Sequence, residues 1–273
     1  MSLPYDMGNV GDLLKHGVLA EFVRWQCDLG RSFRFFDLFG GEPEGPALAR
    51  FARRVLALPD GALRAAQMGI DEGRYFGSGI VARNAATNAS RGTIQVLSGD
   101  RDSERRERLR AAGLAMVDEE FPRWRAGADR YDAYAAFGEI VDILGEDDLV
   151  LLDPFHEFLP RMARTVVPQM ATAARRAAVL LFALNLEPGN SVGRRFDALL
   201  ERHLPGAWRM TCPPVNGELR FHADVVLIAR SLVKRDSGHD VQLLRRRLTD
   251  FTKHLASALG MPEQRLQLRV VGR

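Results

Sequence analysis

The sequence predicts an α/β fold with a doubly wound, mostly parallel sheet. Two observations support it: strand-like and helix-like segments alternate along the chain, and some of the strands are unbroken apolar runs. Residues 149–152 are four apolar residues bounded by acids before and by Asp153-Pro154 after, which is typical of a strand buried on both faces. Residues 178–184 form a second such run. Ligands of open α/β sheets bind outside the carboxyl ends of the strands, so Asp153 is a candidate functional residue, although a simple turn also explains Asp-Pro.

The composition is that of a globular protein of 273 residues, with 46% hydrophobic and 27% charged residues. No run of 18 apolar residues and no basic, then apolar, N-terminal segment occurs, so we expect a cytoplasmic protein without a membrane span. Cys27 and Cys212 are too few and too ordinarily placed for a disulfide framework or a zinc site. We expect buried free thiols and no metal centre.

Arginine dominates the positive charge, because only Lys15, Lys234 and Lys253 among the 38 basic residues are lysines. Arginines crowd residues 101–110 and 245–247. Such clusters could contact the phosphates of a nucleic acid. For the first cluster, interleaved acids favour a solvated helix face instead.

Residues 8–26 are predicted to form a helix, because apolar residues recur there at intervals of three and four. The polar residues Asn9, Asp12, Lys15 and His16 fall on one adjoining arc of that helix. The arc is either a solvent-facing surface or part of a site, and the sequence alone does not decide between them.

The first strand is predicted at 33–37, and the glycine pair Gly40-Gly41 follows it. Glycine there lets the backbone approach a nucleotide closely, as in the first βα turn of a dinucleotide-binding sheet. The third glycine of that fingerprint is missing and Pro43 stands near its place, so a plain strand and turn is the alternative. A helical insertion, broken near residues 59–61, is expected at about 46–72.

The later segments continue the alternation, and we expect one α/β domain over 1–233 and a C-terminal helical tail over 234–273. The helices are predicted at 80–88, 101–112, 132–145, 159–175, 191–203 and 239–259, and the strands at 93–97, 114–117, 208–212 and 225–229, while 266–271 is a short segment of the tail. The strands at 208–212 and 225–229 are expected to finish the sheet in antiparallel fashion. The sheet does not require the tail, which could pack back, dimerise or touch nucleic acid.

Several segments resemble, in order and spacing, the S-adenosylmethionine-dependent large-subunit ribosomal RNA adenine-N6 methyltransferases of the J type. Residues 8–16 match that family's motif Gly-Asn-x-x-Asp-x-x-Lys-His in full. Four further segments look like family motifs with substitutions, namely residues 37–41, 74–79, 132–134 and 153–156. The resemblance covers residues 7 to 232. Around Asp37-Leu38-Phe39, Ser78 and Asp153-Pro154-Phe155 the chain is also similar to methyltransferase-like partners of three-cysteine-motif proteins.

The resemblance implies a Rossmann-like methyltransferase sheet that binds S-adenosylmethionine. It assigns the chemistry to Asp153, Pro154 and Lys15. The residues that it places around the cofactor, together with the glycine turn, are His16, Phe39, Gly40, Gly41, Ser78, Ser98, Asp100, Asp132 and Ala133. Phe155, His156 and Asn9 are expected at the substrate. Ser98 stands where the family has the acid that holds the cofactor ribose, so Asp100 would have to replace that acid.

The chemistry that these residues suggest is methyl transfer to a nucleobase amine, adenine N6 in ribosomal RNA. The amine is a poor nucleophile, and a carboxylate and a carbonyl that accept its hydrogen bonds would stabilise the charge developing on it. The alternative is a methyltransferase-fold protein with lost or altered chemistry that acts as a binding module, which Pro43, Ser98 and Phe155 motivate. A nicotinamide-dependent oxidoreductase fits less well, because the glycine fingerprint is incomplete and no catalytic tyrosine and lysine pair occurs. The sequence does not predict an oligomeric state.

Overall fold

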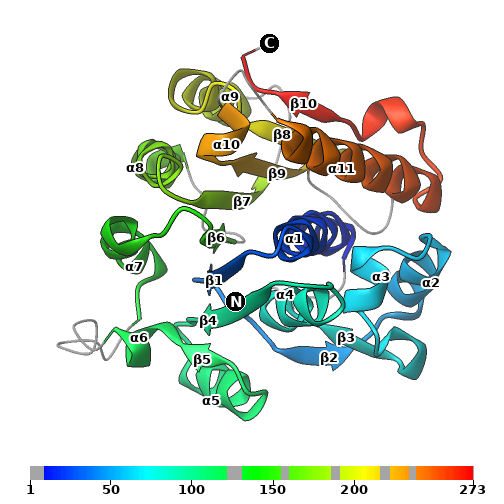
Figure 1. Ribbon diagram of the computed structural model, residues 1–273. Coiled ribbons are helices and arrows are strands. Elements are labelled where there is room, and N and C mark those ends of the chain that lie inside the picture. The colour runs from blue at the N-terminus through cyan, green and yellow to red at the C-terminus, as the bar shows by residue number, and fades with distance from the viewer. Residues whose placement is uncertain are drawn as a thin grey trace.

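The computed structural model describes residues 9–121, 131–154, 160–185, 191–215, 222–233 and 238–272. Within these residues an eight-stranded sheet runs through the molecule in the order β5-β4-β1-β6-β7-β9-β8-β10 (Figure 1). Its strands are β1 (Ser32–Asp37), β4 (Thr93–Ser98), β5 (Ala115–Met116), β6 (Leu149–Leu152), β7 (Ala178–Asn185), β8 (Trp208–Cys212), β9 (His222–Ile228) and β10 (Leu268–Val270).

The centre of the sheet is parallel, because β1 pairs in parallel with both β4 and β6, β4 with β5, and β6 with β7. Strand β9 runs antiparallel between β7 and β8. The predicted doubly wound, mostly parallel sheet with an antiparallel finish is confirmed. Strand β9 begins at His222, three residues before the predicted start.

Strand β6 is buried on both faces, as its apolar run predicts. None of its four residues is more than 1% exposed. Leu149 and Leu151 join one hydrophobic core, whereas Val150 and Leu152 join a second core on the other face of the sheet. Successive strand side chains point to opposite faces, and here both faces are covered.

Helices cover both faces of the sheet. One layer is formed by α7 (Ala133–Ile140), α8 (Pro160–Ala173) and α9 (Ser191–His203), and the other by α1 (Val10–Asp28), α4 (Ser78–Thr87) and α11 (His239–Ala258) (Figure 1). Outside the insertion, the other helices of the described residues are α5 (Ser103–Ala111), α6 (Val117–Glu120) and α10 (Arg230–Val233), together with the 3-10 turns η3 (Val141–Ile143) and η5 (Glu263–Arg265). Two layers around a parallel sheet are the arrangement expected of alternating strands and helices.

Helix α1 is enclosed by the sheet and by neighbouring helices. Its polar residues Asp12, Lys15 and His16 are only 1 to 3% exposed. They therefore do not form a solvent-facing surface, and that interpretation of the polar arc is wrong. The sequence could not exclude it, because a period of 3.6 residues describes a face of the helix and not what covers that face.

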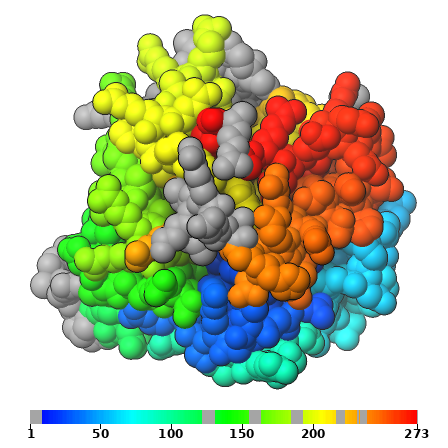
Figure 2. Space-filling view, turned by 45° about the horizontal axis from the view of Figure 1, so that its top comes forward, coloured from blue at the N-terminus to red at the C-terminus, as the bar shows by residue number. Residues whose placement is uncertain are grey.

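The C-terminal segment packs back onto the domain. Strand β10 extends the sheet by pairing with β8, and the ring of Phe251 in α11 lies directly over Gly17 of α1. Trp25 Nε1 donates a hydrogen bond to the carbonyl of Asp240 at 2.8 Å. In the space-filling view the orange and red atoms of this segment adjoin the blue N-terminal and cyan insertion surfaces (Figure 2). We expected that the sheet would not use this segment, and β10 shows that this expectation is wrong. Of the three alternatives given for the tail, packing back onto the domain is the one observed.

The expected helical insertion is present as α2 (Ala49–Ala57), α3 (Ala62–Ala66) and the 3-10 turn η1 (Ile70–Glu72). The break falls near Gly61, as predicted. The strands β2 (Glu44–Pro46) and β3 (Arg74–Phe76) flank the insertion and pair with each other in antiparallel fashion. This pairing was not predicted. Glycine and proline in β2 conceal that strand, because both residues disfavour strand interiors.

Cys27 and Cys212 are buried free thiols, as expected from the sequence. Among the helices of the described ranges, none is long and apolar enough to span a membrane.

Candidate active site at the carboxyl edge of the sheet

Polar residues gather where β1, β4 and β6 end. Asp37 is the last residue of β1 and pairs in register with Ser98, the last residue of β4. Asp37 also pairs with Leu151 of β6, and Asp153 follows that strand directly. Parallel strands bring their carboxyl ends to one edge, which is where ligands bind in open α/β sheets.

Helix α1 begins at the same edge and carries a capping box. The Asn9 side chain accepts a hydrogen bond from the Asp12 amide at 3.1 Å, and the Asp12 carboxylate accepts one from the Asn9 amide at 3.3 Å. These bonds satisfy amide groups that the first turn of a helix leaves without partners. Asn9, a predicted substrate residue, is therefore the N-cap of α1 in this structure.

Lys15 joins helix α1 to the end of β6. Its Nζ lies 2.5 Å from Asp153 Oδ2 and 3.0 Å from Asp12 Oδ1. The Lys15 and Asp12 side chains are 4% and 2% exposed, and that of Asp153 is 12% exposed. The Lys15 ammonium also lies 5.3 Å from the ring centroid of Phe182. Two residues that the resemblance assigns to catalysis, 138 positions apart in the chain, thus form a largely buried ion pair.

His16 is a buried neutral imidazole. Its Nδ1 shares a hydrogen bond with the Tyr75 hydroxyl, and the two rings stack with centroids 5.5 Å apart. Burial, aided by the charge of Lys15, lowers the pKa of His16 to about 3. Among the described residues, Nε2 of His16 has no hydrogen-bond partner. His16 therefore offers one unused polar atom at this edge without adding a charge.

Asp37 lies at the centre of the cluster and is fully buried. Its Oδ2 accepts a hydrogen bond from the Ser78 hydroxyl at 2.5 Å, and within the described ranges its Oδ1 has no partner. Burial raises the pKa of Asp37 to about 6, against the opposing effects of the Ser78 hydrogen bond and the charge of Lys15, while Asp153 raises it further. Ser78, the first residue of α4, is thus held against the end of β1.

The glycine turn after β1 is tightly packed. Gly40 donates its amide to the carbonyl of Gly99 at 2.8 Å, and a Cβ at Gly40 would lie only 2.9 Å from Leu109 Cδ1. Gly41 has φ +65°, a conformation that glycine adopts readily. The residue types at these two positions therefore follow from the close packing and the backbone turn.

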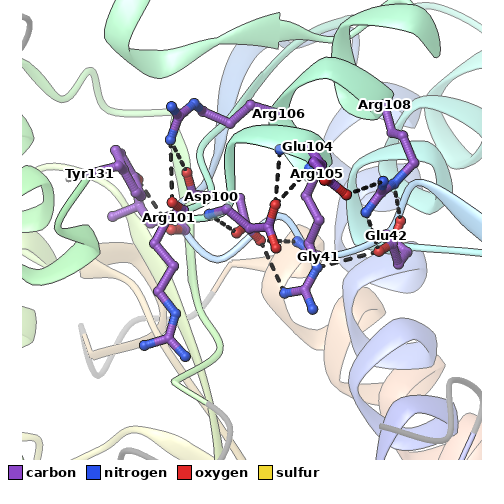
Figure 3. Close-up of polar contacts among 11 residues, drawn as sticks. Gly41, Glu42, Asp100, Arg101, Glu104, Arg105, Arg106, Arg108 and Tyr131 are labelled. Carbon is purple, nitrogen blue, oxygen red and sulfur yellow. Dashed lines mark hydrogen bonds and ion pairs between the residues drawn. The ribbon is translucent and has the colours of Figure 1, made fainter. Parts of the chain in front are cut away.

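Asp100 braces this turn. Its Oδ2 accepts a hydrogen bond from the Gly41 amide at 3.0 Å, and its Oδ1 accepts one from the Asp102 amide at 2.8 Å. Arg105 lies between Asp100 and Glu42, at 3.8 Å and 3.3 Å (Figure 3). Both oxygens of the residue expected to replace the ribose acid are thus engaged by the chain's own backbone.

Arginines of α5 hold the loop that follows the glycine turn. Arg108 contacts both carboxylate oxygens of Glu42 at 2.7 and 2.8 Å, and Arg106 donates to the carbonyl of Asp100 at 2.9 Å (Figure 3). Part of the predicted solvated arginine face is therefore used within the protein.

Tyr131 lies over Gly99 and was not predicted to belong to the site. Its hydroxyl donates to the Leu38 carbonyl at 3.1 Å, and a Cβ at Gly99 would be 2.3 Å from that hydroxyl oxygen. Burial first, and then nearby carboxylates including Asp37 and Asp100, raise the pKa of Tyr131 well above its ordinary value. The phenol thus bridges the turns after β1 and β4.

The remaining expected cofactor residues are dispersed around these turns. Asp132 caps α7 by accepting hydrogen bonds from the amides of Tyr134 and Ala135 at 2.9 and 3.3 Å, and Ala133 is buried behind it. The Phe39 ring meets the Tyr134 ring edge-on at 5.4 Å.

Ser98 and Pro154 are the two other expected site residues that lie within the described ranges. Ser98 is fully buried, and in the described part of the chain its Oγ has no hydrogen-bond partner. Pro154 is buried after Asp153, while Phe155 and His156 lie outside the described residues.

Four residues of the site were assigned no role from the sequence, although Asp12 belongs to the polar arc noted on the first helix. Asp37 and Asp12 belong to segments that match the family motifs, so their positions carried a signal, and Tyr75 belongs to a third such segment. Tyr131 carried no signal, because one aromatic residue before a helix is ordinary.

No family model matches the chain, and no curated protein matches its sequence. Among solved structures, a protein from Legionella pneumophila str. Philadelphia 1 with the family model DUF519 superposes with a TM-score of 0.62. The two sequences are 12% identical, and the match covers 90% of this chain and 94% of that protein. The likeness shows that this chain shares its fold with the Legionella protein. A probable spermidine synthase from Corynebacterium glutamicum gives a TM-score of 0.43 at 10% identity, over 92% of this chain and 75% of that one.

Proposed function

We propose that the protein is an S-adenosylmethionine-dependent methyltransferase that acts on the exocyclic amine of a nucleobase, adenine N6 in ribosomal RNA. The observation that carries the proposal is the Lys15–Asp153 pair at the end of β6, with Nζ and Oδ2 2.5 Å apart. It joins the helix that resembles the Lys-His motif to the strand end that resembles the Asp-Pro signature. The doubly wound, mostly parallel sheet is the fold that the resemblance implies, and it supports the transferase part of the proposal.

The chemistry asks for hydrogen-bond acceptors at the amine, because its lone pair is delocalised into the ring. In our proposal the Asp153 carboxylate and the Pro154 carbonyl accept from the amine and stabilise the positive charge that develops as the new bond forms. Lys15 holds the carboxylate through its Oδ2. The base would have to leave a helical stack to reach this edge, and stacking on Phe155 or His156 would contribute roughly 1–3 kcal/mol.

S-adenosylmethionine would supply the electrophilic methyl group. Three buried polar atoms lack partners among the described residues: Asp37 Oδ1 and His16 Nε2 fit the polar methionine end of such a ligand, and Ser98 Oγ fits its ribose. Buried polar groups normally have hydrogen-bond partners, so a group of such atoms at one sheet edge is consistent with a ligand site. In this proposal His16 and Ser78 hold the methionine end, while Phe39, the two glycines of the turn, Asp100, Asp132 and Ala133 surround the nucleoside.

Calorimetric titration of the purified protein with S-adenosylmethionine tests the cofactor part. Binding that weakens at least tenfold in Ser78→Ala, which removes the donor to Asp37, supports the assignment. No heat and no thermal shift at millimolar ligand would exclude it. S-adenosylhomocysteine serves as a second ligand, because it shares the nucleoside and amino acid ends but carries no methyl group to transfer.

A second candidate function is a methyltransferase-fold binding module without transfer chemistry. Tyr131 favours this candidate, because its ring covers Gly99 and its hydroxyl donates a hydrogen bond to the Leu38 carbonyl at 3.1 Å. Asp100 also accepts hydrogen bonds from two backbone amides. The nucleoside end of the site is thus braced by the chain itself. If Tyr131→Ala binds S-adenosylmethionine and the wild type does not, the module is favoured; tight binding by the wild type favours the enzyme.

A further inference from the structure

Asp12 has two separate contacts in the first turn of α1. Its Oδ2 accepts a hydrogen bond from the Asn9 amide at 3.3 Å, and its Oδ1 accepts one from Lys15 Nζ at 3.0 Å. The side chain is 2% exposed, so these contacts are shielded from water. A residue that only completed the capping box would not need to contact the lysine.

The Lys15 side chain is flexible, whereas an ammonium group that holds a catalytic carboxylate must keep a fixed position. An ammonium has three donors and no acceptor, and its four-carbon stem has several rotatable bonds. One donor direction meets Asp12 Oδ1 at 3.0 Å and another meets Asp153 Oδ2 at 2.5 Å. The ring of Phe182, 5.3 Å away, limits a further direction. If the ammonium contacted only the Asp153 carboxylate, it could move together with that carboxylate. The additional contact with Asp12 fixes the position of the ammonium relative to helix α1.

We propose that Asp12 is a positioning residue that acts through Lys15 to hold the Asp153 carboxylate in its working orientation. This rests on the proposed function, in which Asp153 accepts from the substrate amine. Asp12 touches neither substrate nor cofactor in this role. Because it shares the ammonium, Asp153 remains only partly neutralised and keeps its strength as an acceptor. The capping box ties this arrangement to a rigid helix end, which is the kind of support that precise sites require.

A purely structural role for Asp12 makes different predictions. A lost capping interaction would lower the free energy of unfolding and would leave the Lys15–Asp153 pair intact. A positioning role requires that the Lys15 ammonium loosens when Asp12 is neutralised, and that catalysis slows more than cofactor binding weakens.

The first test observes Lys15 directly and needs no substrate. Since the chain has only three lysines, selective ¹⁵N labelling of lysine gives three side-chain ammonium signals at most. We expect the Lys15 ammonium protons to exchange with water at least tenfold faster in Asp12→Asn than in the wild type. Asp148→Asn is the matched control, because Asp148 is also a buried carboxylate but pairs with Arg34, which lies near the amino-terminal end of β1. It should leave the Lys15 exchange rate unchanged.

Exchange in Asp12→Asn that equals the wild-type rate would overturn the proposal, because the Lys15 ammonium would then be held without Asp12. Acceleration in Asp148→Asn as large as in Asp12→Asn would overturn it too, since the effect would then reflect general loosening. This measurement stands even if the protein transfers no methyl group, so its failure is distinct from failure of the proposed function.

The second test uses methyl transfer to unmodified ribosomal RNA. Asp12→Asn should lower kcat roughly ten- to hundredfold, as expected for misplacement of a reacting group. Its KM for S-adenosylmethionine should change less than about twofold, and Asp12→Glu should recover part of kcat. Equal losses in kcat for Asp12→Asn and Asp148→Asn, or a loss confined to KM, would contradict the positioning role.

Discussion

The Asp37 carboxylate accepts a hydrogen bond from the Ser78 hydroxyl at 2.5 Å, and this contact joins the end of β1 to the start of α4. Asp37 is fully buried, so its charged form is costly, and its pKa is raised from 3.8 to about 6. The residue at the centre of the candidate site therefore lowers stability whenever it is ionised. The pH dependence of unfolding should reveal this cost.

Asp37 should make the protein less stable as the pH rises from about 4 to about 6. In that range the unfolded chain has released the Asp37 proton and the folded protein still holds it, so the free energy of unfolding falls with rising pH. A shift of about two pKa units corresponds to about 3 kcal/mol. Asp37→Asn cannot ionise, so its stability relative to wild type should rise by about that amount between pH 4 and 7 in urea denaturation. Parallel pH profiles would contradict the assignment, and exposed Asp60→Asn is the control.

His16 should act in the opposite direction. Its pKa is lowered from 6.5 to about 3. Between these two pH values the unfolded chain binds a proton at His16 that the folded protein does not bind. The free energy of unfolding should therefore fall as the pH falls from 7 to 4, by about 3 kcal/mol from this residue. His16→Gln should lose correspondingly less stability over that interval. The same substitution at the exposed His239 should leave the profile unchanged, and an equal effect of both would show that His16 is not the cause.

Gly17 tests the docking of the C-terminal helix. A Cβ at this position would lie 1.8 Å from Phe251 Cζ, so Gly17→Ala should lower the free energy of unfolding by about 1–3 kcal/mol through overpacking. Alanine is the better helix former, so the opposite sign is expected of an uncrowded site. Gly138→Ala in α7, where the nearest side-chain atom is 3.4 Å away, is the matched control. If Gly17→Ala is neutral or stabilising in urea denaturation, α11 does not pack here in solution.

The Arg209–Asp224 pair should be the most sensitive ion pair in the antiparallel part of the sheet. Arg209 Nε lies 2.9 Å from Asp224 Oδ1, and the Asp224 side chain is 1% exposed. Arg209→Met leaves a buried carboxylate uncompensated and should cost about 3–5 kcal/mol. Arg209→Met combined with Asp224→Asn should recover part of that loss, whereas Arg110→Met at the surface should cost less than about 1 kcal/mol. Chemical denaturation measures all three, and a small loss in Arg209→Met would show that Asp224 finds another partner.

Most of the sheet could be predicted from the sequence because its central strands are buried on both faces. The apolar runs that became β6 and β7 leave little choice of element, and the alternation with helices fixes a parallel sheet. Strands β2, β3 and β10 are only three residues long. Such short pairings depend on neighbouring strands and are weakly encoded in local sequence, which explains why β2 and β3 were missed and β10 was placed outside the sheet.

The site could be predicted only in part. The resemblance singled out Lys15 and Asp153, but the spacing within α1 could not reveal that the helix is buried all round and brings them together. The contact of Tyr131 with Leu38 and the engagement of Asp100 arise from tertiary packing, which no motif contains. The roles of Phe155 and His156 stay predictions.

Transfer of radiolabelled methyl groups from S-adenosylmethionine to unmodified large-subunit ribosomal RNA tests the central claim most directly. We expect incorporation at adenine N6 by the wild type and a loss of at least a hundredfold in Asp153→Ala, with Asp60→Asn unaffected. Incorporation that survives Asp153→Ala would remove Asp153 from the mechanism. No incorporation by the wild type, despite bound S-adenosylmethionine, would contradict RNA adenine as the substrate.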